Sequence, residues 1–390
     1  GMGSREQSNV PIANMTQLHV DREYFLKIVK NYASFLQYDN SNCRANRQAL
    51  LKAIKNFNTE QKNTCFGLLK DREFILQAVK SASGAFLYSD MNLRSDQKFI
   101  RETLETNGLA LKYMDQSVRE DPEFVLLAIR NNGMAFEYAD TRLRENREFA
   151  FKAVKESGLA LQFSSQPLHA DREIVLEAVK SAGRVLYYAD TAMRADREIV
   201  LEAVKNAGLA LYYSDPSLRA DRQIILEAVK SYGWGLYYAS PNLKAERKIV
   251  LAAVRNDGRA FYYADPCLRT DREIVLEALK TCSSVVQHAH SKFMADREFA
   301  MQAVTFNGNI LKYLDPKLRS DREIVLKAVK NNGLALRYAD DTIQSDGKVV
   351  LEAIKEFGSA INYANKKLKS DQTFIIEAIK LNHDVREYIT

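Results

Sequence analysis

Four tyrosines spaced 25 residues apart are the side chains of this sequence best suited to binding a partner. They are Tyr187, Tyr212, Tyr237 and Tyr262. Equivalent positions elsewhere in the chain hold Lys112, Glu137 or Asn362, so this position faces water and folding does not require a tyrosine there. Trp234, the only tryptophan, occupies an equally variable position in the same stretch. Clustered exposed Tyr and Trp side chains are typical of protein interfaces, so these five residues are candidate anchors for a partner.

An arginine that recurs with the same spacing is the second candidate. Examples are Arg172, Arg197, Arg222 and Arg272. Each follows an acidic residue at the expected start of a helix, where the helix dipole disfavours a cation by roughly a few tenths of a kcal/mol. We therefore expect a compensating carboxylate or carbonyl from an adjacent repeat, for example Asp190, Asp215 or Asp265. A phosphate-binding stripe and a simple solvated charge are the alternatives.

A cluster of Cys282, His288 and His290 interrupts the pattern. Cys and His are zinc ligands, but no fourth ligand is evident, and two His two residues apart on a short helix diverge. We therefore expect a relaxed repeat or a hinge here, as in the divergent stretch 58–64, and no metal site. The sequence also lacks a Gly-rich phosphate loop, a nucleophile elbow and a His-Glu-x-x-His motif, so we expect no catalysis, cofactor or small-molecule substrate.

These side chains belong to a strict 25-residue repeat. The string Asp-Arg-Glu-x-Val-Leu-x-Ala-Val-Lys, or a close variant, begins at Asp171, Asp196, Asp221, Asp271 and Asp321. Steps of 25 from Asp21 give fourteen whole repeats and one of 20 residues, without insertion, up to Thr390. When each repeat is numbered from its first residue, the four tyrosines are at position 17, Trp234 is at position 14 and the arginines are at position 2.

Each repeat predicts two helices. Apolar residues at positions 4, 5, 6, 8 and 9 form one face of a helix of about ten residues, capped by the acidic or Asn residue at position 1. The Gly common at position 13 is expected as a left-handed residue that ends this helix. The following apolar segment, such as 209–214, is long enough for two turns of a second helix. The remaining stretch has turn chemistry and one core Leu at position 23.

The Tyr that recurs at position 18, such as Tyr213 and Tyr238, is expected to pack between repeats. A ladder that stacks on a ligand is the alternative. One repeat cannot bury its own apolar face, whereas stacked repeats share a continuous core. The sequence therefore predicts an all-α fold, an α-solenoid of about fifteen 25-residue two-helix repeats.

The repeat pattern continues as Gly-x-Ala-Leu-x-Tyr-Ala-Asp. Over residues 21–390 it resembles a bacterial family catalogued as a domain of unknown function, whose domain of roughly 50 residues would be two repeats. The resemblance implies tandem helical repeats, often in bacteria that live inside protists or other host cells. It implies no established activity and no catalytic residues.

Composition sets the broad class of the protein. With 46% hydrophobic and 27% charged residues in a chain of 390, disordered and collagen-like proteins are excluded. No apolar run approaches the roughly 18 to 20 residues of a membrane span. The four cysteines have neither disulfide nor metal-site spacing and predict free thiols in a reducing compartment. We expect residues 1–20 to be a tag remnant and flexible N-terminus without a secretory signal, and residues 21–390 to be a single helical-repeat array.

We interpret the chain as a non-enzymatic scaffold that binds a protein or peptide partner. It would act in the cytoplasm or, as a secreted bacterial effector, in a host cytosol. The alternative is a helical-repeat protein that binds RNA or another nucleic acid by stacking bases on the aromatic row. The net charge of +6 permits an anionic partner, but 50 acidic residues are interleaved with 56 basic ones, so a positive stripe would require the acidic residues to lie on another face. A purely structural or oligomerising role is the third interpretation.

Overall fold

The computed structural model of the chain describes residues 22–35 and 43–389, and every regular element within these ranges is a helix. This confirms the predicted all-α repeat fold. The expectation for residues 1–20 lies outside the described residues. Within the two described ranges, no helix is both long and apolar enough to cross a membrane.

The described part of the chain divides into two compact units, with the division between Met193 and Arg194. The longer α-helices of the first unit are α1 (Arg22–Phe35), α2 (Cys43–Lys55), α3 (Thr59–Leu69), α4 (Arg72–Ser81), α6 (Gln97–Thr106), α8 (Pro122–Asn131), α10 (Arg147–Glu156) and α11 (Arg172–Ser181). Its 3₁₀ helices are η2 (Ser83–Tyr88), η3 (Gly108–Tyr113), η4 (Gly133–Tyr138), η5 (Gly158–Phe163), η6 (Gln166–Ala170) and η7 (Gly183–Tyr188). Its short α-helices are α5 (Met91–Ser95), α7 (Gln116–Arg119), α9 (Thr141–Glu145) and α12 (Thr191–Arg194), the last of which ends at the first residue of the second unit.

The second unit repeats the same elements. Its longer α-helices are α13 (Arg197–Asn206), α14 (Arg222–Ser231), α16 (Arg247–Asn256), α17 (Arg272–Leu279), α18 (Arg297–Phe306), α20 (Arg322–Asn331), α22 (Gly347–Ile354) and α24 (Gln372–Leu381). They are followed by the 3₁₀ helices η8 (Gly208–Tyr213), η10 (Gly233–Tyr238), η11 (Gly258–Tyr263), η13 (Ser283–His288), η15 (Gly308–Tyr313), η16 (Gly333–Tyr338), η17 (Gly358–Tyr363) and η18 (His383–Tyr388). The short third helices are η9 (Pro216–Ala220), α15 (Pro241–Lys244), η12 (Pro266–Thr270), η14 (Ser291–Ala295), α19 (Pro316–Arg319), α21 (Asp341–Gln344) and α23 (Lys366–Ser370).

The long helix of the repeat follows the sequence pattern closely. The side chain of Asp196 accepts hydrogen bonds from the amides of Glu198 and Ile199, at 3.0 and 3.1 Å, and so caps α13 as predicted. The apolar positions of this helix are buried: Ile199, Val200, Leu201, Ala203 and Val204. They form the share of the core that each repeat contributes.

The second helix is a 3₁₀ helix, a type that the sequence pattern did not distinguish. In a 3₁₀ helix, residues three apart lie above one another on the same side. In η8 the glycine, alanine and leucine at positions 13, 15 and 16 are buried, whereas Tyr212 at position 17 is exposed. Positions 14 and 17 therefore share the outer side, which explains why both vary between repeats.

A third short helix occupies the stretch that was interpreted as a turn. In η9, the side chain of Asp215 accepts from the amide of Ser217 at 2.9 Å and caps this helix. The hydrophobic residue at position 23 points to the core as predicted, since Leu243 and Leu318 are each 8% exposed.

The prediction for the glycine at position 13 is wrong. Within the described part of the chain, no residue, glycine included, has a positive φ angle. The long helix ends instead at an extended residue, such as Ala207 with φ −146°. Glycine is required because a Cβ on Gly208 would lie 2.2 Å from the carbonyl oxygen of Ala228 in the next repeat. The recurring glycine at position 13 thus reflects a close approach between repeats.

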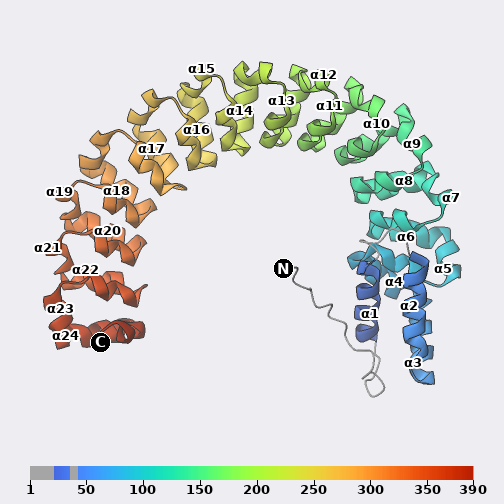
Figure 1. The fold of residues 1–390 in the computed structure, drawn as a ribbon, viewed down its shortest axis with the longest axis horizontal. Coiled ribbons are helices and arrows are strands. Elements are labelled where there is room, and N and C mark those ends of the chain that lie inside the picture. Colours follow the sequence, from blue (N-terminus) through green and yellow to red (C-terminus); the bar gives the residue numbers. More distant parts are fainter. Residues whose placement is uncertain (1–21, 36–42, 390) are drawn as a thin grey trace, which may run out of the picture. The chain divides into compact units, whose positions relative to one another are not determined.

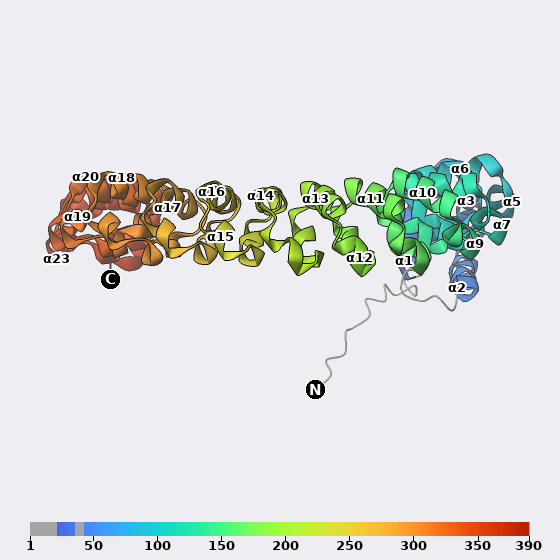
Figure 2. The same ribbon diagram turned by 90° about the horizontal axis from the view of Figure 1, so that it is seen from above.

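Neighbouring repeats pack side by side within each unit. Consecutive long helices contact each other, and so do consecutive 3₁₀ helices such as η10 and η11. In the second unit, the long helices follow one another in chain order, with α15, α19, α21 and α23 along the opposite edge (Figure 1). Figure 2 shows α14 and α16 in one row and α15 in another. Main-chain hydrogen bonds join the repeats, for example from Asp265 N to Lys244 O at 2.9 Å.

The repeat 46–70 departs from the pattern, as its sequence predicted. Here α2 is followed by α3, an α-helix in place of the 3₁₀ helix. A capping box begins α3, because Asn58 Oδ1 accepts from the amide of Gln61 (2.8 Å) and Gln61 Oε1 accepts from the amide of Asn58 (3.2 Å).

Candidate binding surface

Three exposed tyrosines of the second unit, Tyr212, Tyr237 and Tyr262, recur once per repeat on the outer side of η8, η10 and η11. We call them the tyrosine row. Their exposed fractions are 59%, 55% and 40%. The exposure predicted for position 17 is thereby observed. Tyr187, at the same position of η7, is 57% exposed and belongs to the first unit, where its ring meets that of Tyr188 edge-on at 5.0 Å.

Half-buried tyrosines hold the row from behind. The ring of Tyr237 meets Tyr238 of its own repeat at 5.0 Å and 85°, and Tyr263 of the next repeat at 5.2 Å and 71°. Tyr212 packs in the same way on Tyr213 (5.3 Å, 83°) and Tyr238 (5.9 Å, 73°). Position 18 therefore packs between repeats, as predicted, and the rings of Tyr212 and Tyr237 are each fixed by two edge-to-face contacts.

Burial raises the pKa of the Tyr238 hydroxyl, and the neighbouring tyrosines Tyr232, Tyr212 and Tyr237 raise it further. The hydroxyl is therefore neutral at physiological pH. The aromatic surface presents hydrogen-bond donors and apolar ring faces, and it carries no charge of its own.

The tyrosine row ends where the sequence pattern changes. Tyr262 packs edge-on against His288, which replaces the usual tyrosine, at 5.0 Å and 87°. The Tyr262 hydroxyl lies 2.7 Å from the hydroxyl of Ser284. These contacts make Tyr262 the least exposed member of the row.

Trp234 differs from the prediction that it is an exposed anchor. The residue is half-buried, and its indole N–H donates to Oδ2 of Asp257 in the next repeat at 3.0 Å. Its ring lies 5.3 Å from that of Tyr263, and the guanidinium of Arg259 lies 5.3 Å from the indole centre. Arg259 lowers the pKa of Asp257, and the Trp234 N–H adds to this effect. Trp234 thus joins two repeats beside the row, a role that its variable position did not reveal.

Two basic residues at position 24, Arg219 and Lys244, lie next to the row and were missed by the sequence analysis. The guanidinium of Arg219 lies 5.5 Å from the centre of the Tyr238 ring, and Lys244 Nζ lies 5.7 Å from that of Tyr237. Comparison of the repeats could have found them, because most repeats have a Lys or Arg at this position: Arg44, Arg94, Arg119, Arg144, Arg194, Arg219, Lys244, Arg269, Arg319 and Lys369.

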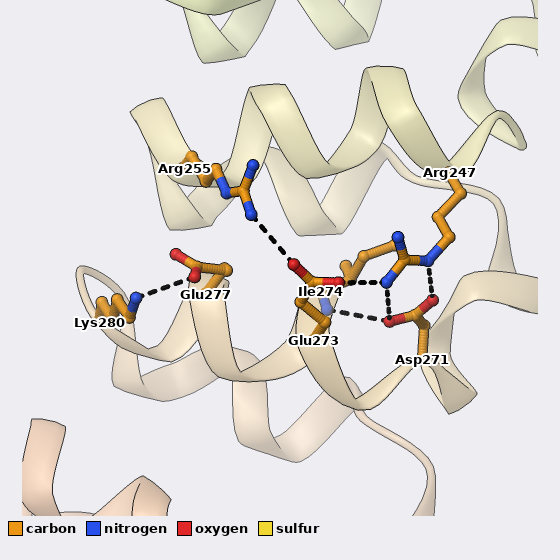
Figure 3. A network of polar contacts seen from close by, with 7 residues as sticks. All are labelled: Arg247, Arg255, Asp271, Glu273, Ile274, Glu277 and Lys280. Atoms are coloured by element: carbon orange, nitrogen blue, oxygen red, sulfur yellow. Dashed lines mark hydrogen bonds and ion pairs between the residues drawn. The ribbon is translucent and has the colours of Figure 1, made fainter.

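The arginines at position 2 form a ladder on the long helices. Arg247 Nε donates to Asp271 in the next repeat at 2.6 Å, and the same guanidinium contacts Glu273 (Figure 3). Other arginines pair with the first residue of the next repeat, as Arg322 does with Asp346 at 2.6 Å. The predicted pairing between adjacent repeats is confirmed, but its partner is the helix cap at position 1.

The proposed partners at position 20 have another task. Asp190, Asp215 and Asp265 each accept from the amide two residues later, at 2.9 to 3.0 Å. Their carboxylates cap the short third helices instead of reaching the arginines of position 2. The arginines of the ladder are therefore paired with acidic residues at the start of the next long helix.

The repeat also places the chain in a family. The family described as a domain of unknown function (DUF4116) matches residues 71–119, 121–169, 146–194, 171–219, 196–244, 221–269, 246–294, 271–318, 296–344 and 346–390. The chain belongs to this family. The overlapping matches are offset by one 25-residue repeat, so one family domain corresponds to two repeats. No curated protein matches the chain.

The divergent repeat 271–295 is also matched by the family, and its His and Cys side chains have structural contacts. His290 Nδ1 accepts from the amide of Lys292 at 3.1 Å and caps η14, while Cys282 Sγ lies 3.2 Å from Ser284 Oγ. Among the residues that the structure describes, no group of three or more His, Cys, Asp or Glu side chains could hold a metal ion. The long helix of this repeat, α17, is two residues shorter than its neighbour α16, with 8 residues against 10.

Proposed function

We propose that the chain is a non-enzymatic scaffold that binds a protein or peptide partner through the tyrosine row. The observation that carries this proposal is the exposure of three consecutive tyrosines at a position that most other repeats fill with polar or charged residues. Contiguous exposed apolar surface of this kind marks interaction sites on soluble proteins. Tyr187, at the same position in the first unit, is exposed as well and is a candidate anchor of that unit, and Trp234 supports the row through its contact with Tyr263.

The rings are prepared for binding because their positions are fixed beforehand. Tyr212 and Tyr237 each pack edge-on against a half-buried tyrosine of their own repeat and one of the next repeat, and Tyr262 packs edge-on against His288 of the next repeat. A partner therefore has little side-chain entropy to remove from this surface, and tyrosine contributes a large contact area with few rotatable bonds.

The test compares proteins captured from a cell lysate by three forms of the chain. They are the wild type, a variant with Tyr212, Tyr237 and Tyr262 changed to Ala, and a control with Lys312, Arg337 and Asn362 changed to Ala. The control alters the same position of three later repeats. Mass spectrometry should find proteins that the wild type and the control retain and that the tyrosine variant loses. Identical proteins with all three forms would refute the proposal.

Nucleic-acid binding is the second candidate, favoured by Arg219 and Lys244 beside the tyrosine rings. The same captures are repeated after nuclease treatment and at rising salt concentration. Phosphate contacts release counterions, so binding to nucleic acid should weaken steeply with salt. Partners lost on nuclease treatment would move this candidate to first place.

We place the scaffold in a reducing cytosol, either of a bacterium or of its host. Cys65, Cys267 and Cys282 are free thiols, which agrees with a reducing compartment. A reporter enzyme fused to the chain and expressed in a host-associated bacterium tests for delivery. Reporter activity in the host cytosol would support an effector, and activity confined to the bacterium would support a resident scaffold.

A further inference from the structure

The tyrosine row repeats one arrangement of rings at successive repeats. An exposed ring and a half-buried ring of the next repeat stand close to a right angle, Tyr212 with Tyr238 at 73° and Tyr237 with Tyr263 at 71°. A partner that lies along the row therefore meets an equivalent pair of rings once per repeat. The partner should itself be periodic with the same spacing.

The spacing of packed helices limits the partner's conformation. Neighbouring helices pack about 8 to 10 Å apart. A polyproline II helix has three residues per turn and a rise of about 3.1 Å, so it presents the same side every 9 Å or so. A β-strand presents the same side about every 6.8 Å, and an α-helix turns every 5.4 Å or so, and both lose register after one repeat. Polyproline II is the conformation that matches.

Charge beside the row adds a second requirement. Within the described part of the chain, Lys244 and Arg219 lie over tyrosine rings and form no ion pair with a carboxylate within 4.0 Å. The ladder arginine Arg247, by contrast, is paired with two carboxylates. The cations beside the row are thus available to acidic groups of a partner.

The same surface does not suit a polyanion. Asp215 belongs to the same short segment as Arg219, and hydrogen bonds from Ser217, with the charge of Arg219 as a smaller contribution, lower its pKa. Its carboxylate is therefore ionised at neutral pH and offsets part of the positive charge. Scattered acidic residues fit this mixed surface better than one phosphate per nucleotide does.

We infer that the partner segment is an acidic, proline-rich peptide that lies along the tyrosine row as a polyproline II helix. This inference rests on the proposed function and specifies its partner class. Prolines three residues apart pack on the ring pairs, as in other aromatic surfaces that recognise polyproline II. Acidic residues between the prolines contact Lys244 and Arg219.

The experiment selects partners for the full chain from a displayed library of random peptides of about 12 residues, long enough to follow three repeats. Peptides that bind the variant with Tyr212, Tyr237 and Tyr262 changed to Ala are removed. We expect the remaining peptides to be enriched in proline at three-residue spacing and in Asp or Glu. No enrichment, or enrichment of sequences without this spacing, would overturn the inference.

Fluorescence anisotropy then tests the best selected peptide. Replacement of its prolines by alanine should weaken binding on the order of tenfold, and Lys244→Ala should weaken it severalfold, whereas Asn362→Ala should leave it unchanged. A (U)12 oligonucleotide that binds more tightly than the peptide, with a steep salt dependence, would overturn the inference. Lysate proteins that need the tyrosine row but lack the proline spacing would refute this inference alone and leave the proposed function standing.

Discussion

Nε of Arg247 donates to Oδ2 of Asp271 in the next repeat at 2.6 Å, while Oδ1 of the same Asp271 accepts from the amide of Ile274 at 3.1 Å (Figure 3). The carboxylate of Asp271 thus caps the N-terminus of α17 and also bonds an arginine of the preceding repeat. The same arrangement occurs at Asp171 and Asp221, which are bonded by Arg147 and Arg197. Because each repeat of a solenoid contacts only its neighbours, such double use strengthens every interface where it occurs.

Removal of the Asp271 side chain should destabilise the fold through both contacts. We expect Asp271→Ala to lower the free energy of unfolding by about 1 to 2 kcal/mol, mainly because the N-terminal cap of α17 is lost. Asp271→Asn keeps a cap acceptor and should cost less. Arg247→Gln should also cost less, since exposed ion pairs contribute little. Urea unfolding followed by circular dichroism measures the stability of the three variants. An equal loss of stability in all three would contradict the claim that the helix cap is the main contribution of Asp271.

Acid should destabilise the ladder in a narrow pH range. The hydrogen bond from Arg297 lowers the pKa of Asp321 against the opposing effect of burial. At Asp271 burial is the largest effect and acts to raise the pKa, but the bonds from Arg247 and Ile274 together lower it. A folded state with lowered Asp pKa values binds fewer protons than the unfolded chain. Its extra stability is therefore present above the ordinary Asp pKa of about 3.9 and is lost as the pH falls through the lowered values.

Thermal unfolding at constant ionic strength checks this pH dependence. The midpoint should change little between about pH 7 and pH 5 and should decrease below about pH 4. The variant Asp321→Asn should show a smaller decrease, because it has lost one of the contributing carboxylates. A midpoint that already decreases from pH 7 to pH 5 would point to other titrating groups.

The sequence predicted the elements that depend on local pattern. The cap at Asp196, the length of α13 and its buried face follow from residue types at fixed spacing within one repeat. The partners of Arg247 were not predicted, because the pattern within one repeat does not show that the guanidinium reaches the carboxylates at positions 1 and 3 of the next repeat. The bond from Trp234 to Asp257 crosses between repeats, and the sequence does not show which repeats bring such side chains within reach. Contacts between repeats therefore required the structure.

Gly208 should tolerate no side chain. A Cβ there would lie 2.2 Å from the carbonyl oxygen of Ala228 and 2.7 Å from Oγ of Ser231. We expect Gly208→Ala to push the two repeats apart and to cost about 1 to 3 kcal/mol or more. Gly67 in α3 is the matched control, since a Cβ there would meet nothing within 4 Å.

The control substitution Gly67→Ala should affect the free energy of unfolding in the opposite direction. Alanine is a better helix former than glycine by up to about 1 kcal/mol, so Gly67→Ala should leave the protein unchanged or stabilise it. Urea unfolding of both variants provides the comparison. If Gly208→Ala and Gly67→Ala change the free energy of unfolding by similar amounts, the close approach to Ala228 is not the reason for glycine at position 13.

Trp234 and Tyr237 share the outer side of η10 but should differ in what they contribute. Trp234→Phe removes the N–H that bonds Asp257, and it should lower the free energy of unfolding by about 1 kcal/mol. Tyr237→Ala removes a ring that is 55% exposed and should cost less than Trp234→Ala, which removes a half-buried ring and its bond to Asp257; both substitutions lose a contact with Tyr263. Circular dichroism is the suitable probe, because replacement of the only tryptophan removes the fluorescence signal.

The comparison decides which aromatic residue is structural. If Trp234 joins repeats and Tyr237 is free for a partner, the unfolding midpoint should decrease most for Trp234→Ala, less for Trp234→Phe and least for Tyr237→Ala. The reverse order would mean that the exposed ring holds the repeats together. In that case Tyr237→Ala would damage the fold and could not be used to test binding. The variant used in the capture experiment would then carry a substitution of Trp234 in place of Tyr237.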